Sequence, residues 1–183
     1  MPALDCGMLV RMARPYLRHT AHIEGDFVVF LIGARLVKPW KFWSIIPVGR
    51  AMNAMMKELE AHPELGYLGQ ETWGARTSIQ VQYWRSRDHL IDYARKRDSV
   101  HLPAWRHFNK VVAKSTAVGI WHETYSIRAG EYECIYGNMP LFGLARATKR
   151  LEITGTHETA KGRLGVTDGT DGPEGVAVDP DRG

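Results

Sequence analysis

The sequence predicts an α+β domain in which helices cover one face of an antiparallel sheet. Three observations lead to this fold class. Residues 26–37 form a strand that is apolar on both faces, residues 77–85 alternate between two sets of side chains, and segments with helical periodicity lie between the strands. A strand that is apolar on both faces must be covered on both. Because the chain has too few further strands to build a second layer, a partner subunit is expected to supply it.

The first half of the domain has the pattern strand, helix and β-hairpin. An aromatic and basic connection follows the strand at 26–37 and leads to a helix at 50–61. Four apolar residues share one face of that helix: Met52, Met55, Met56 and Leu59. Residues 66–73 and 77–85 then form the hairpin.

The second half supplies the remaining elements, which are helices at 87–96 and 103–115, then strands at 118–127 and 132–136. Ser86 or Asp88 caps the first of these helices, and Pro103 is favourable in the first turn of the second. The core order β-α-β-β-α-α-β is the ferredoxin-like pattern with one helix split in two. Such a sheet carries helices on one face only, and a second copy commonly covers the other, which gives a dimeric α+β barrel.

The chain divides into three parts by composition. Residues 1–24 form an N-terminal arm, and residues 25–150 form the ferredoxin-like domain. Residues 151–183 form an acidic tail that is rich in Gly, Asp and Thr and lacks aromatic residues, so it is predicted to be mostly disordered.

Composition also narrows the function classes. The net charge is +4, but the basic residues are scattered and no run of Lys or Arg exceeds three, so no nucleic-acid partner is expected. No apolar run approaches the ~20 residues of a membrane span, and the first residues lack a signal core, so a cytoplasmic protein without a membrane partner is expected. Cys6 and Cys134 show neither metal spacing nor a disulfide framework. The motifs GxGxxG, GxxxxGK[ST], GxSxG and HExxH are absent, so no metal site and no nucleotide-binding enzyme is expected.

Six segments together resemble a known protein family. They are GDFVVFLIGARLVKPWK, HPELGYLGQETW, QYWRSRDHLIDYAR, HLPAWRHFN, GIWHETY and YGNMP. The resemblance is to a family of unknown function that is described as monooxygenase-like and belongs to the dimeric α+β barrel superfamily. It covers roughly residues 20–146. It implies the fold, and it implies a choice among cofactor-free oxygenases, haem-degrading enzymes, haem-containing aldoxime dehydratases and non-catalytic binding proteins.

His101 is the first candidate for chemistry. It lies just before the helix that Pro103 starts, so it sits near the positive end of a helix dipole, which favours the neutral ring. A neutral imidazole serves as a base or as a ligand of haem iron. The alternative is a loop histidine that is hydrogen-bonded to backbone. His107, inside the helix, is expected on the surface.

The strand at 118–127 carries the second set of candidates. Trp121, Glu123 and Tyr125 share one face, and His122 lies on the other, but the sequence leaves open which face lines a cavity. A desolvated Glu123 would shuttle protons; alternatively it pairs with Arg85 or another basic neighbour.

Other residues complete a predicted pocket. Trp84 shares a face with Gln80 and Gln82, which suits a partly polar cavity, while Tyr83 is expected to pack under the helices. The remaining lining residues are Trp105, Tyr136 and Asn138, the last two at the pocket mouth.

These residues lead to one main hypothesis and two alternatives. The main hypothesis is a homodimeric monooxygenase-like enzyme that acts on a hydrophobic or aromatic small molecule, either without a cofactor or with haem held by His101. His101 and Glu123 would be catalytic, and the aromatic residues would bind substrate. The alternatives are a haem-dependent dehydratase of the aldoxime type and a non-catalytic module that binds a small molecule or haem.

Overall fold

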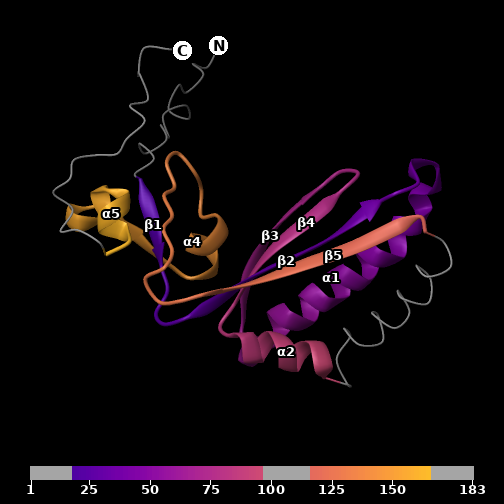
Figure 1. The fold of residues 1–183 in the computed structure, drawn as a ribbon, viewed down its shortest axis with the longest axis horizontal. Coiled ribbons are helices and arrows are strands. Elements are labelled where there is room, and N and C mark those ends of the chain that lie inside the picture. Colours follow the sequence, from indigo (N-terminus) through magenta and orange to yellow (C-terminus); the bar gives the residue numbers. More distant parts are fainter. Residues whose placement is uncertain (1–17, 97–115, 166–183) are drawn as a thin grey trace, which may run out of the picture.

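The structure, a computed structural model, describes residues 18–96 and 116–165 (Figure 1). Its main sheet has four strands in the order β3-β4-β2-β5, and every neighbouring pair is antiparallel. The strands are β2 (Phe27–Leu36), β3 (Tyr67–Gly74), β4 (Ser78–Trp84) and β5 (Val118–Ile127). The predicted class, an α+β fold with an antiparallel sheet, is confirmed.

Two helices lie on one face of this sheet (Figure 1). Helix α1 (Ile46–Ala61) starts with a proline in its first turn and buries Met55, Met56 and Leu59, which are three of the four residues of the predicted stripe. Helix α2 (Arg87–Arg95) begins at Ser86, whose hydroxyl accepts a hydrogen bond from the backbone N–H of His89 at 3.3 Å. Short 3₁₀ turns, η2 (Pro39–Ile45) and η3 (Pro63–Leu65), connect α1 to β2 and β3.

The core between helices and sheet is built around Trp84, which is 1% exposed. Its ring packs among residues of β2, α1 and α2: Val28, Met55, Met56, Leu59, Leu90 and Tyr93. Its Nε1 donates to Oε1 of Gln82 at 3.1 Å, and Nε2 of Gln82 donates to Oε1 of Gln80 at 3.1 Å. These bonds allow two amide side chains to be buried beside an apolar core.

The predicted assignment of faces on β4 is therefore wrong. The helices cover Trp84 and the two glutamines, while Tyr83 lies on the opposite face. Alternation correctly sorts these side chains into two sets, but the position of α1 and α2 decides which set is buried under helices.

A second, smaller unit packs against the other face of the sheet at one end (Figure 1). It contains an antiparallel pair, β1 (His19–His22) and β6 (Lys149–Glu152), and helix α4 (Gly143–Ala147). Leu144 and Ala145 of α4 contact Phe27, Val29 and other residues of the sheet. The turn η4 (Gly155–Glu158) and helix α5 (Ala160–Arg163) complete the unit.

This unit corrects two predictions. Residues 151–165 lie in ordered elements because β6 pairs with β1, so the predicted disorder is wrong for that part of the tail; residues 166–183 lie outside the described residues. The predicted strand at 132–136 is absent; only Tyr136 forms a bridge, to His19. Among the described residues, no helix combines the length and the apolar character needed to cross a membrane.

Candidate functional site

The register of β5 on β2 shows which face of β5 lies away from the helices. Trp121, Glu123 and Tyr125 pair with Gly33, Leu31 and Val29, and cross-strand partners share a face. Val28 of β2 alternates with these residues and packs under the helices. The three β5 side chains therefore lie on the face away from the helices. His122 lies on the helix side, where the centroid of its ring is 5.7 Å from that of Phe30. We call the face that carries Leu31, Trp73, Val81, Trp121, Glu123 and Tyr125 the open face.

Glu123 and Tyr125 form a hydrogen-bonded pair on the open face. The Tyr125 hydroxyl donates to Oε2 of Glu123 at 2.6 Å, and both residues are exposed. This hydrogen bond, followed by the charge of Glu123, raises the pKa of the Tyr125 phenol above its usual range. The pair joins a carboxylate to a phenol, two groups that can act as acid or base when they are positioned against a substrate. The predicted alternative, an ion pair between Glu123 and Arg85, has no counterpart among the contacts of the described residues.

Gly33 shapes the surface beside this pair. A Cβ atom at Gly33 would meet the carbonyl oxygen of Ser78 at 2.0 Å and Nε1 of Trp121 at 2.8 Å, so only glycine allows the Trp121 indole to lie this close to β2. The sequence analysis missed Gly33. A glycine inside an apolar strand is the signal that marks such a close approach.

Strand β3 adds an aromatic side chain and a buried carboxylate. Trp73 pairs with Ile79 and contacts Phe142 edge-on at 5.8 Å. Oε1 of Glu71 accepts a hydrogen bond from the backbone N–H of Gly143 at 2.8 Å, and Oε2 lies 3.0 Å from the guanidinium of Arg146. The sequence analysis also missed Glu71, although a lone carboxylate opposite Val81 in a paired strand was a usable signal.

Tyr136 and Asn138, the predicted mouth residues, differ in burial. Tyr136 is half-buried, its ring stacks on His19 at 5.0 Å, and its oxygen accepts a hydrogen bond from the backbone N–H of Leu144 at 3.1 Å. Burial raises its pKa. Asn138 is exposed and has φ +52°, a conformation that asparagine tolerates in turns. Tyr136 thus packs within the smaller unit.

The other predicted residues divide into two groups. Trp84 lies in the helix-side core and so is removed from the open face. His101 and Trp105 lie outside the described residues. The structure thus brings together Trp121, Glu123 and Tyr125 of the predicted set and adds Leu31, Trp73 and Val81.

Two hollows lie elsewhere on the described chain. A cavity of about 790 Å³ runs along the outer edge of β3, between the end of α1 and α4, and includes Tyr67, Gln70, Glu71 and Arg146 in its lining. A cavity of about 370 Å³ lies where β1, β2 and β6 approach one another. Neither of these two cavities is lined by Trp121, Glu123 or Tyr125.

Comparison with solved structures supports the fold. An aldoxime dehydratase in complex with butyraldoxime superimposes with a TM-score of 0.60 at 16% identity, covering 74% of this chain and 42% of the enzyme. A second aldoxime dehydratase has a TM-score of 0.49 at 15% identity, and the match covers 82% of this chain and 43% of the enzyme. A dimeric ferredoxin-like protein from an uncultured marine organism has a TM-score of 0.37 at 14% identity, and the match covers 57% of this chain and 96% of that protein. This chain thus spans less than half of either dehydratase, and the likeness concerns the fold alone.

Sequence comparison identifies the family. No curated protein matches the chain significantly. A family model described as "Monooxygenase af470-like" matches residues 27–144, which include the main sheet, both of its helices and the start of α4. The resemblance seen in the sequence is confirmed: the chain belongs to the Monooxygenase af470-like family.

Proposed function

We propose that this protein is a cofactor-free oxygenase that oxidises an electron-rich aromatic small molecule on the open face of its sheet. The hydrogen-bonded pair of Glu123 and Tyr125 carries the proposal, because it stands beside Trp121 on a face that also presents Leu31 and Val81. Family membership supports the reaction class, and the aromatic and aliphatic side chains suit a planar, apolar substrate.

The proposed chemistry begins with proton removal. The substrate is a polyphenol with a CH₂ group between aromatic rings, and the carboxylate of Glu123 accepts a proton from it while Tyr125 orients the carboxylate. The resulting anion gives electrons to O₂. In the complete reaction the CH₂ group becomes a carbonyl group and loses four electrons; one oxygen atom enters the product and the other leaves as water. The substrate supplies all the electrons, so no external reductant is required.

A second copy of the chain completes the proposed site. Trp73 is 43% exposed and Tyr125 is 48% exposed, although both lie on a face with apolar neighbours. An apolar sheet face of this kind is normally covered. A second copy whose open face turns toward the first would bury these side chains and exclude water, which strengthens the electrostatic interactions of Glu123. This pairing is the predicted dimeric barrel.

Neither of the two cavities described above fits a haem group. A haem site needs an apolar slot with an axial ligand such as histidine. His22 is the only histidine among the linings of the two cavities described above, and it is exposed beside the charged residues Glu24 and Lys149. His101, the predicted ligand, lies outside the described residues. We therefore assign no step to haem, and the aldoxime-type dehydratase is supported by likeness of fold only.

Oxygen uptake tests the proposal. With a polyphenol panel, Glu123→Gln is expected to lower kcat/KM by at least ~10², because the general base is lost. Tyr125→Phe should have a smaller effect, since it removes only the orienting donor. Glu131→Gln is the matched control, because Glu131 is an exposed carboxylate beyond the end of β5 that pairs with Arg128. Equal activity of Glu123→Gln and Glu131→Gln would contradict the proposal.

A haemin titration distinguishes the cofactor-free oxygenase from a haem enzyme and from a binding module. Under the proposal, protein titrated with haemin shows no Soret shift, and oxygen uptake needs no haem. A shift that disappears in His101→Ala, together with activity only in the loaded protein, would overturn the cofactor-free mechanism. Tight ligand binding without turnover would instead identify a binding module.

A further inference from the structure

One end of the molecule exposes a group of large apolar side chains. They belong to η2 and its flanks and are between 46% and 68% exposed: Val37, Trp40, Phe42, Trp43 and Ile46. The turn η2 buries none of its own residues, and Phe42 and Trp43 pack edge-to-face against each other at 5.3 Å. We call these five residues the aromatic tip. Exposed apolar side chains gathered in this way mark an interaction surface.

The base of the aromatic tip is fixed to the sheet. The backbone N–H of Val37 donates to the carbonyl of Ala117 at 2.8 Å, and Nζ of Lys38 donates to Oγ1 of Thr116 at 2.7 Å. Beyond these bonds, Lys41 departs from helical geometry (φ −105°, ψ 41°), so η2 is kinked. The tip lies at one end of the long axis of the molecule, as the indigo turn at the right of Figure 1. It is therefore held in position while its side chains face solvent.

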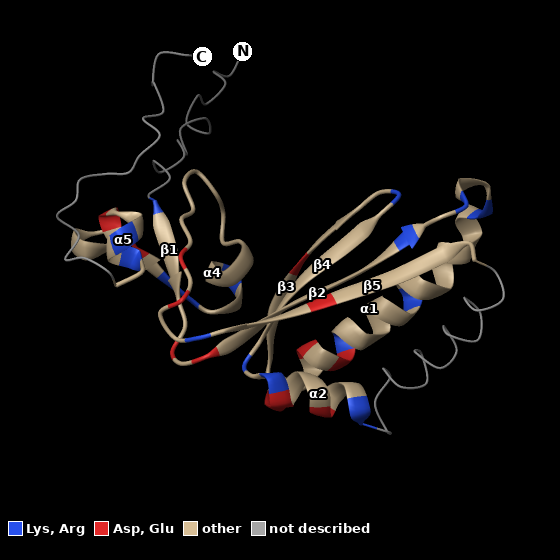
Figure 2. Ribbon diagram, viewed as in Figure 1, with Lys and Arg blue, Asp and Glu red and all other residues tan. Residues whose placement is uncertain are grey.

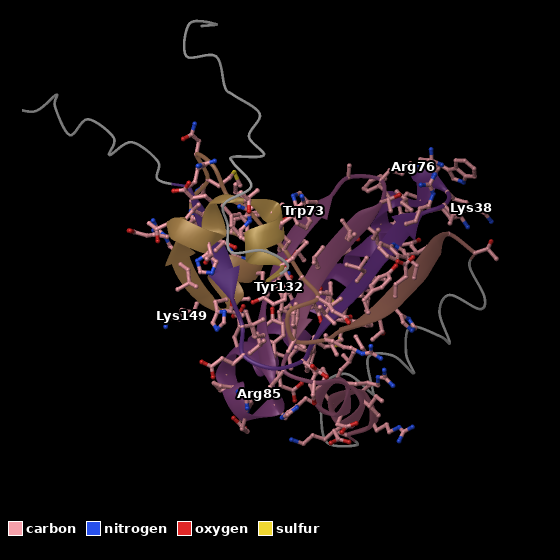
Figure 3. All side chains as sticks on the ribbon, turned by 60° about the vertical axis from the view of Figure 1, so that its left-hand side comes forward. Lys38, Trp73, Arg76, Arg85, Tyr132 and Lys149 are labelled. Carbon is pink, nitrogen blue, oxygen red and sulfur yellow. The ribbon has the colours of Figure 1, made fainter. Side chains whose placement is uncertain are left out.

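In the described segments that form this end, the Lys and Arg residues have no acidic counterparts. Residues 33–50, 74–78 and 116–122 contain Arg35, Lys38, Lys41, Arg50 and Arg76 and no Asp or Glu. Arg76 donates through Nε to the carbonyl of Leu36 at 3.3 Å, which holds it beside the tip. Figure 2 shows Lys and Arg at this end, and Figure 3 shows Lys38 and Arg76 close together and far from Lys149.

We propose that the aromatic tip docks the protein onto the surface of an anionic lipid bilayer. Trp40, Phe42 and Trp43 enter the headgroup region, where amphipathic aromatic rings are favoured. Lys38, Lys41 and Arg76 contact lipid phosphates, since basic residues near a bilayer are attracted to anionic lipids. The sequence predicted no membrane partner on the ground that no segment spans a bilayer; docking at the surface requires no span.

Shape and composition favour a bilayer over other occupants. The tip projects beyond the sheet, and the two cavities of about 790 and 370 Å³ lie on other elements. Val37 and Ile46 are aliphatic and do not stack on nucleic-acid bases. The docking proposal is independent of the reaction, although a bilayer would bring an apolar substrate close to the enzyme.

Sedimentation of the full chain with vesicles tests the docking. We expect binding to vesicles of phosphatidylcholine with about 30% phosphatidylserine, weaker binding to phosphatidylcholine alone, and a loss of binding at high salt. Trp40→Ala combined with Trp43→Ala should lower the partition coefficient at least about tenfold. Leu141→Ala combined with Leu164→Ala is the matched control, because these apolar residues are also exposed but lie away from the tip. Lys41→Glu should weaken binding more than Lys149→Glu.

Several outcomes would overturn the proposal. They are no sedimentation with either vesicle type, binding that the tip variants leave unchanged, and a tip variant that turns a dimer into a monomer. Since the substituted tryptophans are exposed, the urea midpoint of the tip variant should equal that of the wild type, so any loss of binding reports on the surface and not on folding. Loss of activity in Glu123→Gln without loss of vesicle binding would separate this proposal from the proposed reaction.

Discussion

On the open face, single residues determine how closely neighbouring side chains pack against the sheet. The Trp121 indole lies close to β2 only because the residue opposite it on that strand is Gly33. Glu123 accepts its hydrogen bond from Tyr125, two residues along the same strand. Trp84 illustrates the opposite case, because its residue type suggested substrate binding and its position is in the core. At this scale, what a side chain does depends on the face it occupies.

Gly33→Ala is expected to destabilise the protein by about 1–3 kcal/mol, because the new methyl group meets backbone that cannot move away. It should also displace the Trp121 indole and change its fluorescence. Urea unfolding measures the first effect. Gly119→Ala in β5 is the control, since its Cβ would meet only Cγ2 of Val37 at 3.8 Å, an ordinary contact. Equal unfolding free energies for the two variants would contradict the close approach at Gly33.

At the scale of elements, Glu71 attaches α4 to the sheet. The helix has only five residues and cannot be stable alone. Three polar contacts join it to β3: Glu71 accepts from the N–H of Gly143, Arg146 pairs with Glu71, and Arg146 also donates to the carbonyl of Gln70. Because Arg146 is 52% exposed, the ion pair contributes little, and the buried bond to Gly143 is the important one.

Two substitutions at Glu71 should therefore lower the free energy of unfolding by different amounts. Glu71→Ala leaves the N–H of Gly143 without an acceptor and is expected to cost about 2–3 kcal/mol. Glu71→Gln keeps an acceptor oxygen and should cost less than half as much. Urea unfolding gives the free energies, and hydrogen exchange at residues 143–147 should accelerate in the alanine variant. If the glutamine variant is as unstable as the alanine variant, the ion pair and not the bond to Gly143 holds α4.

At the scale of the whole molecule, the described residues form two apolar clusters, one on each face of the sheet. The first includes Trp84 and the helices, and the second joins α4 and β1 to Phe27. Both clusters enclose tyrosines. Burial is the main cause that raises the pKa of Tyr67 and Tyr93 in the first cluster and of Tyr83 and Tyr136 in the second; the contact with Glu58 raises that of Tyr93 further.

Stability should accordingly fall in alkali. In the unfolded chain these tyrosines lose their protons near pH 10, whereas in the folded chain they hold them to higher pH. Their contribution to the free energy of unfolding is therefore fully present below about pH 10 and is lost as the pH rises toward the pKa values of the folded state. Urea midpoints measured at about pH 8 and pH 11 should show the decrease. Tyr67→Phe should reduce the decrease at little cost near pH 8, since the hydrogen bond that its hydroxyl makes among the described residues is a weak one, to the sulfur of Met56 at 3.8 Å. A midpoint that is unchanged in alkali would contradict the prediction.

Local patterns were enough to predict most of the secondary structure. Alternation in TSIQVQYWR predicted β4, the methionine stripe predicted the buried face of α1, and Ser86 caps α2 as one of the two predicted residues. The grouping of Trp121, Glu123 and Tyr125 on one face also followed from alternation. These features depend on residues a few positions apart, which is the range at which backbone geometry acts.

The sequence by itself determined the class of fold, the family and the sets of side chains that share a face. Only the tertiary structure decided which set meets the helices, that Glu71 reaches Gly143, and that β1 pairs with β6 across more than a hundred residues of chain. The reason is physical. Alternation is symmetric with respect to the two faces of a sheet, and only the packing of distant elements against one of them removes that symmetry.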